Sequence, residues 1–153
     1  MAHPLEQFFP NLHPTEWEKT SEKSDDYNCI AHAFNDTTRW WSPQKGYYWP
    51  DDEERNETIE SYSRALAKLR CERCQDGTIE NGFEKFAIYT REDGTPSHMA
   101  LQLADGRWSS KIAELEDIAH NHLDALSGTP TASSPSPWMP YGQVAAFLKR
   151  SVI

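Results

Sequence analysis

The sequence predicts an α+β domain in which N-terminal helices pack on an antiparallel sheet. Three observations support this prediction. Helical patterns occupy the first half of the chain, strand patterns begin only near residue 83, and Asp105-Gly106 is a strong hairpin signal between two of the strands. The length of 153 residues suits one domain. We expect an irregular N-terminal arm over residues 1–25 and a single domain over 26–153.

Two helices are predicted in the first half. Asp26 and Asn28 are good N-cap residues and alanines follow them, so we expect a helix over 28–38. A second helix is expected over 57–70, where apolar residues recur at helical spacing. The segment between them is predicted to be a loop, because Pro and Gly interrupt a run of aromatic residues, namely Trp40, Trp41, Tyr47, Tyr48 and Trp49.

Three consecutive strands are predicted after residue 82. Residues 83–90 are rich in aromatic and aliphatic side chains, and residues 97–104 alternate, with His98 and Met99 on opposite faces. Residues 107–111 are predicted to form the strand that follows the hairpin turn. We therefore expect an antiparallel arrangement in which His98 begins the middle strand.

The register of the hairpin decides which of two serines shares the face of His98. A two-residue turn at Asp105-Gly106 would place Ser109 on that face, because side chains alternate along a strand. A bulge would place Ser110 there instead. Both alternatives remain open from the sequence.

The C-terminal part is expected to add one helix and one strand. Residues 115–126 are predicted to be helical, with His120 and His122 exposed to solvent. A Pro/Ser-rich insertion follows at 129–140, and residues 142–153 are predicted to form an edge strand of the same sheet.

Composition excludes several classes of function. The net charge of −9 disfavours nucleic-acid binding, and no apolar run is long enough to cross a membrane. The N-terminus lacks the features of a secretory signal, and three cysteines are an odd number, which favours reduced thiols. We expect a cytoplasmic protein whose substrate or partner is a peptide or protein.

Cys29 and His98 form the one constellation with a catalytic pattern. A cysteine in the first turn of a helix lies where the helix dipole and free N–H groups favour the thiolate. His98 has the small Ala100 as its neighbour on the same face, which leaves room for a second side chain to approach. An imidazole there can take the thiol proton and return it to a leaving group, and this chemistry needs no cofactor.

Short runs of sequence carry a family resemblance. They are Tyr27-Asn28-Cys29-Ile30-Ala31, Trp40-Trp41-Ser42-Pro43, Tyr48-Trp49-Pro50, Gly82-Phe83-Glu84-Lys85, Ser97-His98-Met99-Ala100-Leu101-Gln102-Leu103, Asp105-Gly106-Arg107-Trp108-Ser109-Ser110-Lys111 and Tyr141-Gly142. With them the chain resembles an uncharacterised bacterial family, a domain of unknown function, over about residues 26–150. It departs from that family at His32, where an aromatic residue is expected, and in the insertion at 129–140.

A more distant similarity implies an activity. A cysteine at a helix start, a histidine that opens a strand and an Asp-Gly hairpin are similar to papain-like thiol hydrolases of the NlpC type. The similarity implies a papain-like core and a hydrolase or acyltransferase that acts on an amide, isopeptide or thioester bond. Cys29 would attack, and His98 would act as general base and acid. Ser110, or alternatively Ser109, would orient the ring.

The remaining site residues are assigned around this pair. The Cys29 N–H, with the Asn28 side chain, is expected to hold the oxyanion. Trp40, Trp41 and Trp49 are expected to bind substrate in a groove beside the helix, or alternatively to pack as a loop over the second helix.

Two further hypotheses compete with the enzyme. A non-catalytic module of accessory or immunity type could use the same aromatic loop to hold a protein partner. A zinc site could form from Cys29, His32, Cys71 and Cys74, whose spacing suits a Cys₃His set.

Overall fold

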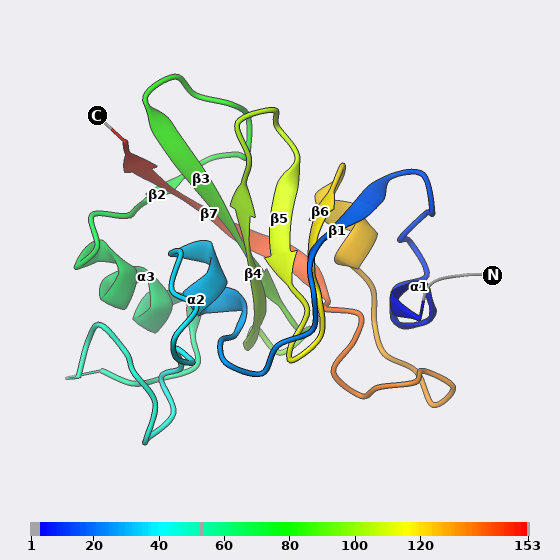
Figure 1. Cartoon of the computed structure of the whole chain (residues 1–153). Coiled ribbons are helices and arrows are strands. Elements are labelled where there is room, and N and C mark those ends of the chain that lie inside the picture. Colours follow the sequence, from blue (N-terminus) through cyan, green and yellow to red (C-terminus); the bar gives the residue numbers. More distant parts are fainter. Residues whose placement is uncertain (1–3, 53, 153) are drawn as a thin grey trace.

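The computed structural model describes residues 4–52 and 54–152, and its main feature is one seven-stranded sheet. The strand order is β1-β6-β5-β4-β3-β7-β2, with every neighbouring pair antiparallel (Figure 1). The fold is therefore mixed α+β and mostly sheet, which confirms the predicted class. The helices are α1 (Leu5–Phe8), α2 (Cys29–Ala33), α3 (Ile59–Ala67) and the 3-10 helix η1 (Leu123–Leu126); the strands are β1 (Trp17–Ser21), β2 (Glu72–Cys74), β3 (Phe83–Thr90), β4 (Pro96–Gln102), β5 (Trp108–Lys111), β6 (Asp117–His120) and β7 (Gln143–Ser151).

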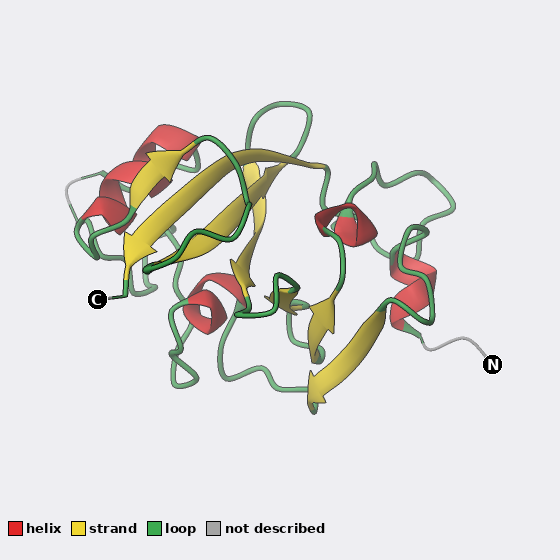
Figure 2. Ribbon diagram, turned by 90° about the horizontal axis from the view of Figure 1, so that it is seen from above, coloured by secondary structure: helices red, strands yellow, loops and turns green. Residues whose placement is uncertain are grey.

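Each face of the sheet carries its own hydrophobic core. One face presents Phe86 and Met99 and is covered by α2, α3 and the aromatic loop. The other face presents Tyr89 and Ala100 and is covered by α1, the residues after it and η1. This division follows from the alternation of side chains along β3 and β4. The sheet is strongly twisted when viewed from above (Figure 2).

The β4–β5 hairpin has a three-residue turn, which settles the register that the sequence left open. The turn spans 104–106, and its last residue is a glycine with a φ of +93°, a conformation that glycine adopts at little cost. Ser109 therefore pairs with Leu101 rather than with the next residue along β4. As a result Ser110 lies on the face of His98, and Ser109 lies on the opposite face.

Two predictions for the C-terminal part are wrong. Residues 115–126 form β6 and then η1 rather than one helix. The buried polar residues of β6, Asp117 and His120, have partners from other parts of the chain, which local sequence patterns do not reveal. The strand predicted at the edge is β7, which lies inside the sheet because β2 pairs along its outer side.

Part of the N-terminal arm, expected to be irregular, is regular structure. β1 pairs with β6 and forms one edge of the sheet, with Trp17 opposite His120. The indole of Trp17 also donates a hydrogen bond to Glu6 in α1 (2.8 Å). The arm is thus attached to the sheet through β6, whose existence the sequence did not predict.

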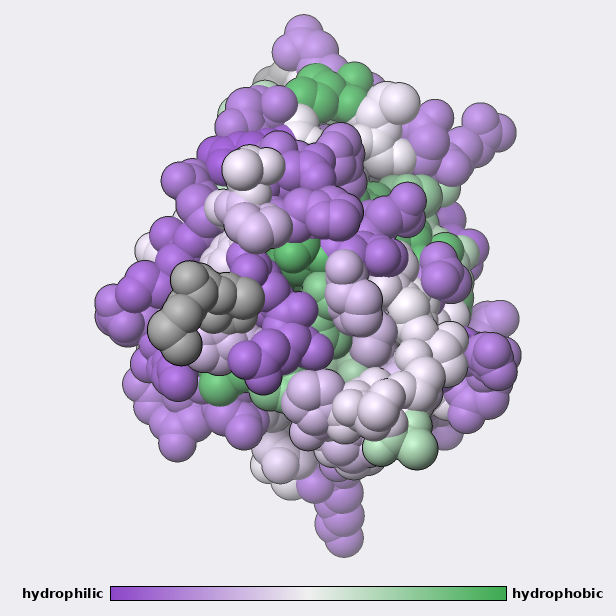
Figure 3. Space-filling model, turned by 90° about the vertical axis from the view of Figure 1, so that its right-hand side faces the viewer, coloured by the Kyte–Doolittle hydropathy of each residue, from purple (hydrophilic) through white to green (hydrophobic). Residues whose placement is uncertain are grey.

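The helices are short and the surface is polar. α2 ends at Ala33, shortly before Asn35 adopts a φ of +61°, and α3 has nine residues within the predicted 57–70. No helix of the described residues has the length and apolar character needed to cross a bilayer. Hydrophilic side chains cover most of the face in Figure 3, in keeping with a charged fraction of 25%.

Candidate functional site

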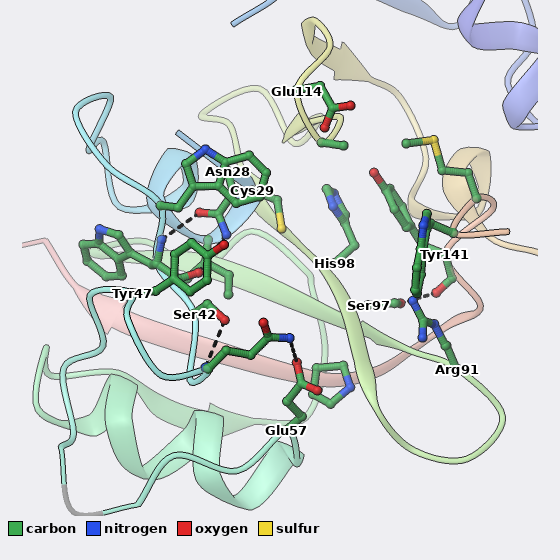
Figure 4. Close-up of a pocket in the computed structure, with 18 of the residues that line it drawn as sticks. Asn28, Cys29, Ser42, Tyr47, Glu57, Arg91, Ser97, His98, Glu114 and Tyr141 are labelled. Carbon is green, nitrogen blue, oxygen red and sulfur yellow. Dashed lines mark hydrogen bonds between the residues drawn. The ribbon is translucent and has the colours of Figure 1, made fainter. Parts of the chain in front are cut away.

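A cavity of about 530 Å³ opens at the end of the sheet where β4 begins (Figure 4). Its walls come from the start of α2, the aromatic loop and the turns after β3 and β5. The insertion at 129–140 adds a further wall and is closed at its base, because Gly128 and Gly142 exchange two backbone hydrogen bonds (2.7 and 2.8 Å). The lining includes Cys29, Tyr47, Glu57, His98, Glu114 and Tyr141.

Cys29 is the first residue of α2 and is partly buried. In the view of Figure 4 its sulfur lies beside the His98 ring, and the thiol makes no hydrogen bond to Nδ1 of that ring. Burial raises the pKa of the Cys29 thiol to about 11, although the backbone N–H groups of Met99, Ile30 and Cys29 itself favour the thiolate. The sequence led us to expect a lowered pKa at this helix start. Burial outweighs that effect, so the resting thiol is protonated.

His98 is almost fully buried, with 4% of its surface exposed. Its ring stacks on Tyr141 at a centroid distance of 4.2 Å and an interplanar angle of 2°. Nε2 lies 2.9 Å from the Ser110 hydroxyl, whereas Nδ1 is buried without a hydrogen-bond partner. Burial, together with the nearby His120 and His32, holds the pKa of His98 well below its ordinary value, so the resting ring is neutral.

A chain of hydrogen bonds fixes the tautomer of His98. Nδ1 of His120 lies 2.9 Å from the carbonyl oxygen of His122, which can only accept, so Nδ1 carries a proton. Burial lowers the pKa of His120 to about 4, so the ring is neutral and its Nε2 accepts the Ser110 hydroxyl proton (2.8 Å). Ser110 then accepts from Nε2–H of His98. Nδ1 of His98 is left as an unprotonated base.

These three side chains, His98, Ser110 and His120, are called the relay below. Their hydrogen bonds end at a backbone carbonyl, and the described structure places no carboxylate in the chain of bonds. The ring nitrogen of the relay that has no hydrogen-bond partner is Nδ1 of His98. The sequence had treated His120 as a solvent-exposed helical residue; it is fully buried in β6.

The other serine belongs to a separate group of polar side chains under α2. The Ser109 hydroxyl lies 2.7 Å from Nε2 of His32. Nδ1 of His32 lies 3.5 Å from Asp117, which accepts a hydrogen bond from the Tyr27 hydroxyl (2.6 Å). Neither Ser109 nor His32 lines the cavity. Ser109 therefore does not orient His98.

Asn28 is the N-cap that the sequence predicted, and it also bonds the backbone of the aromatic loop. Its Oδ1 accepts from the backbone N–H of Ala31 (3.2 Å) as an N-cap and from that of Trp41 (3.1 Å). Its Nδ2 donates to the Trp41 carbonyl (2.7 Å). The amide thus fastens the aromatic loop to the helix that carries Cys29, and these bonds use both of its polar atoms.

The three tryptophans assigned to substrate binding have different positions. Trp40 lines the cavity and donates its indole N–H to the Asp25 carbonyl (2.7 Å). Trp41 also lines the cavity but is buried and stacks on Phe34. Trp49 is buried against Tyr62 and does not contribute to the lining. The loop is therefore both a packing element and, through Trp40 and its neighbours, a wall of the cavity.

Residues from two other segments complete the site. Tyr141 stacks on His98, and Trp138 and Arg91 line the cavity with the guanidinium 4.7 Å from the indole centroid. The sequence gave little sign of these contacts, because the insertion that carries Trp138 was read only from its composition.

The zinc hypothesis required four side chains to converge. Among residues 4–52 and 54–152, no group of three or more His, Cys, Asp or Glu side chains is arranged to hold a metal ion. His32 is bonded to Ser109, and the thiol of Cys74 donates to the Asp76 carbonyl (3.5 Å). The proposed Cys₃His set is therefore not formed.

The fold and site describe an α+β domain with a buried thiol and imidazole at the end of one sheet. A family model described as Domain of unknown function (DUF7689) matches residues 18–149, and the chain belongs to this family. No match was found among curated proteins or among solved structures.

Proposed function

We propose that the protein is a cysteine hydrolase or acyltransferase that acts on an amide, isopeptide or thioester bond in a peptide or protein. The observation that carries the proposal is Nδ1 of His98, a buried base without a partner in the cavity that Cys29 lines. An orphaned buried nitrogen costs free energy, about 1–3 kcal/mol. Such an atom is retained most readily where a transient partner, here the thiol proton, occupies it.

The chemistry follows from the two neutral groups. As the Cys29 sulfur bonds to the carbonyl carbon, the thiol proton moves to Nδ1 of His98. When the intermediate collapses, the bond to the leaving group breaks and Nδ1 returns the proton to that group. Water or an acceptor amine then bonds to the acyl carbon and gives a proton to Nδ1. The C–S bond breaks, and Nδ1 returns the proton to the Cys29 sulfur, which restores the resting thiol and ring. Because both groups are neutral at rest, proton transfer accompanies attack and does not precede it.

The relay supports this role by holding the ring. Ser110 accepts from Nε2–H throughout the cycle and keeps Nδ1 directed at the cavity. In this proposal Ser110 takes the third role of the papain-like arrangement that the sequence suggested, and its hydrogen bond to His120 supports that assignment. The Cys29 N–H in the first turn of α2 is the candidate oxyanion donor. All three cysteines are free, which supports a reducing, cytoplasmic setting.

A second candidate is a non-catalytic module that binds a protein partner in the same cavity. It is favoured by the high pKa of Cys29 and by two exposed aromatic side chains on the rim, Tyr47 (44% exposed) and Trp138 (60% exposed). In this reading the orphaned nitrogen of His98 receives a hydrogen bond from the partner.

Acyl transfer from p-nitrophenyl acetate separates the two candidates. We expect peptide mapping to find the acetyl group on Cys29, arriving at least about tenfold faster than on Cys71 or Cys74. Cys29→Ala should abolish the burst of p-nitrophenol, and Cys74→Ala, the matched control, should leave it unchanged. Acetylation of Cys74 or of lysines with Cys29 unmodified would reject the enzyme and favour the binding module.

A further inference from the structure

We propose that the substrate carries a positive charge, such as an alkylammonium group, close to the bond that Cys29 attacks. This inference rests on the proposed function and extends it to the class of substrate. It begins from the charged side chains that line the cavity, which are Glu57, Glu114 and Arg91.

The two carboxylates are available to a ligand. Glu57 accepts one long hydrogen bond from Gln44 (3.4 Å), and no hydrogen bond or ion pair of the Glu114 side chain occurs within the described residues. Neither forms an ion pair in that part of the chain, although Lys111 interacts electrostatically with Glu114, and both glutamates are exposed. In the view of Figure 4 they lie on opposite sides of Cys29 and His98. A group bound between them would therefore lie beside the thiol.

Arg91, the one lysine or arginine among the described residues of the lining, is already engaged. The Arg91 guanidinium lies over the Trp138 ring at 4.7 Å, a cation–π distance. In Figure 4 it lies on the side of Ser97 and Tyr141, away from Tyr47. The lining that includes Tyr47 and Trp40 also includes both glutamates. Arg55 lies outside the lining and donates to the Tyr47 carbonyl (3.1 Å) and to Asp52 (2.6 Å), so this cation is already paired. Aromatic faces beside carboxylates suit an ammonium group.

The acidic side chains alone would not define a site. The second observation is His98, nine-tenths buried or more, whose unpartnered Nδ1 lies in the same cavity. It marks the point where the reacting bond must lie, and the two glutamates lie around that point. An anionic substrate would meet two like charges there, and a cationic one would meet two opposite charges.

Three matched alkylating probes test the charge preference at Cys29. They are N-(4-aminobutyl)-2-chloroacetamide, N-butyl-2-chloroacetamide and 4-(2-chloroacetamido)butanoate, which differ in charge at the same chain length. In each reaction an S–C bond forms, the C–Cl bond breaks, chloride leaves and the thiol proton passes to His98. Labelling rates at Cys29 and Cys74 are measured by peptide mapping at about 0.15 M salt, where long-range effects of the net charge are screened.

We expect the cationic probe to label Cys29 about tenfold faster than the anionic probe, as two partly exposed charge contacts would allow. The preference should fall to about twofold in the double variant Glu57→Gln/Glu114→Gln. Glu60→Gln, an exposed glutamate of α3 outside the lining, is the control and should keep the full preference.

The experiment distinguishes failure of the charge preference from failure of the proposed function. Equal rates for the three probes at a reactive Cys29 overturn the inference and leave the enzyme proposal standing. The same preference at Cys74 also overturns it, because the effect then belongs to the charge of the whole chain. A Cys29 that no probe labels, while Cys74 reacts, overturns the proposed function and this inference with it.

Discussion

Two adjacent serines of β5 place their hydroxyls on opposite faces of the sheet, and each bonds Nε2 of a histidine. On one face Ser109 bonds His32, whose other nitrogen faces the carboxylate of Asp117. On the other face Ser110 bonds His98, whose other nitrogen has no partner. The first group has the hydroxyl, imidazole and carboxylate of a hydrolase triad. The second group lacks the carboxylate but has the cavity.

The difference is the basis for proposing the site at His98 and not at His32. The Ser109 group does not line the cavity, and its Asp117 also accepts a hydrogen bond from the Tyr27 hydroxyl. Its ring nitrogens both face protein atoms. The relay, in contrast, ends at an unused lone pair in a cavity that holds a thiol. The proposal therefore follows the unpaired ring nitrogen that borders the cavity, not the number of triad residues that are present.

The largest expected effect is on the alkylation rate of Cys29, which should depend on His98 and not on His32. His98→Gln removes the base and should slow alkylation of Cys29 by iodoacetamide at pH 7 by roughly 10²–10⁴-fold, the range for general acid–base catalysis. His32→Gln should change the rate by less than about threefold, because His32 does not line the cavity. Peptide mapping with Cys71 as an internal reporter of unfolding gives both rates. Equal effects of the two substitutions would show that the comparison of the faces is mistaken.

A smaller but still large effect on the free energy of unfolding is expected when the pH is lowered. His98 and His120 have lowered pKa values because they are buried, so the unfolded chain binds protons that the folded chain does not. Their stabilisation is fully present above the ordinary histidine pKa of about 6.5 and is lost as the pH falls below it. Since the folded pKa of His120 is about 4, this residue alone should remove about 3 kcal/mol of unfolding free energy by pH 4.

Urea unfolding at pH 7 and at pH 4 measures this loss. His120→Gln should be less stable than the parent at pH 7 but should lose about 3 kcal/mol less on acidification. His32→Gln should relieve less of the loss, because the adjacent Asp117 opposes the burial that lowers the pKa of His32. The same pH dependence in the parent and in His120→Gln would mean that His120 is not buried as a neutral ring.

The sequence suggested Cys29 and His98 as a pair, and both line one cavity, but it did not suggest the hydrogen bonds of His98 through Ser110 to His120. The alternation of β4 and the N-cap at Asn28 are local signals, and they predicted that Cys29 begins a helix and that His98 lies on a strand. That the two residues act together was implied mainly by the papain-like resemblance. The α+β class followed from local signals. The charge states did not, because the pKa of Cys29 depends on burial by distant segments.

The errors lie where tertiary contacts override local pattern. β6 has only four residues and contains two polar ones that are buried, so its sequence resembled an exposed helix. Once β6 was missed, His120 and the strand pairing of the N-terminal arm were missed as well. The choice between the two serines needed a three-residue turn in place of a two-residue one, and the pair Asp105-Gly106 is compatible with both.

The smallest predicted effect tests that register directly. Ser110→Ala leaves Nε2–H of His98 without an acceptor and frees the ring to turn, so alkylation of Cys29 should slow by about tenfold. Ser110→Thr keeps the hydroxyl and should restore most of the rate. Ser109→Ala is the matched control, one residue away on the same strand, and should leave the rate within about twofold.

The pH dependence of the rate separates a role in orienting His98 from a purely structural role. A structural role alone would lower the stability of Ser110→Ala without changing how the alkylation rate depends on pH. Loss of the fixed tautomer should change that dependence, because either nitrogen of His98 could then carry the proton. If Ser109→Ala slowed Cys29 as much as Ser110→Ala did, the register of the hairpin and the relay built on it would both be wrong.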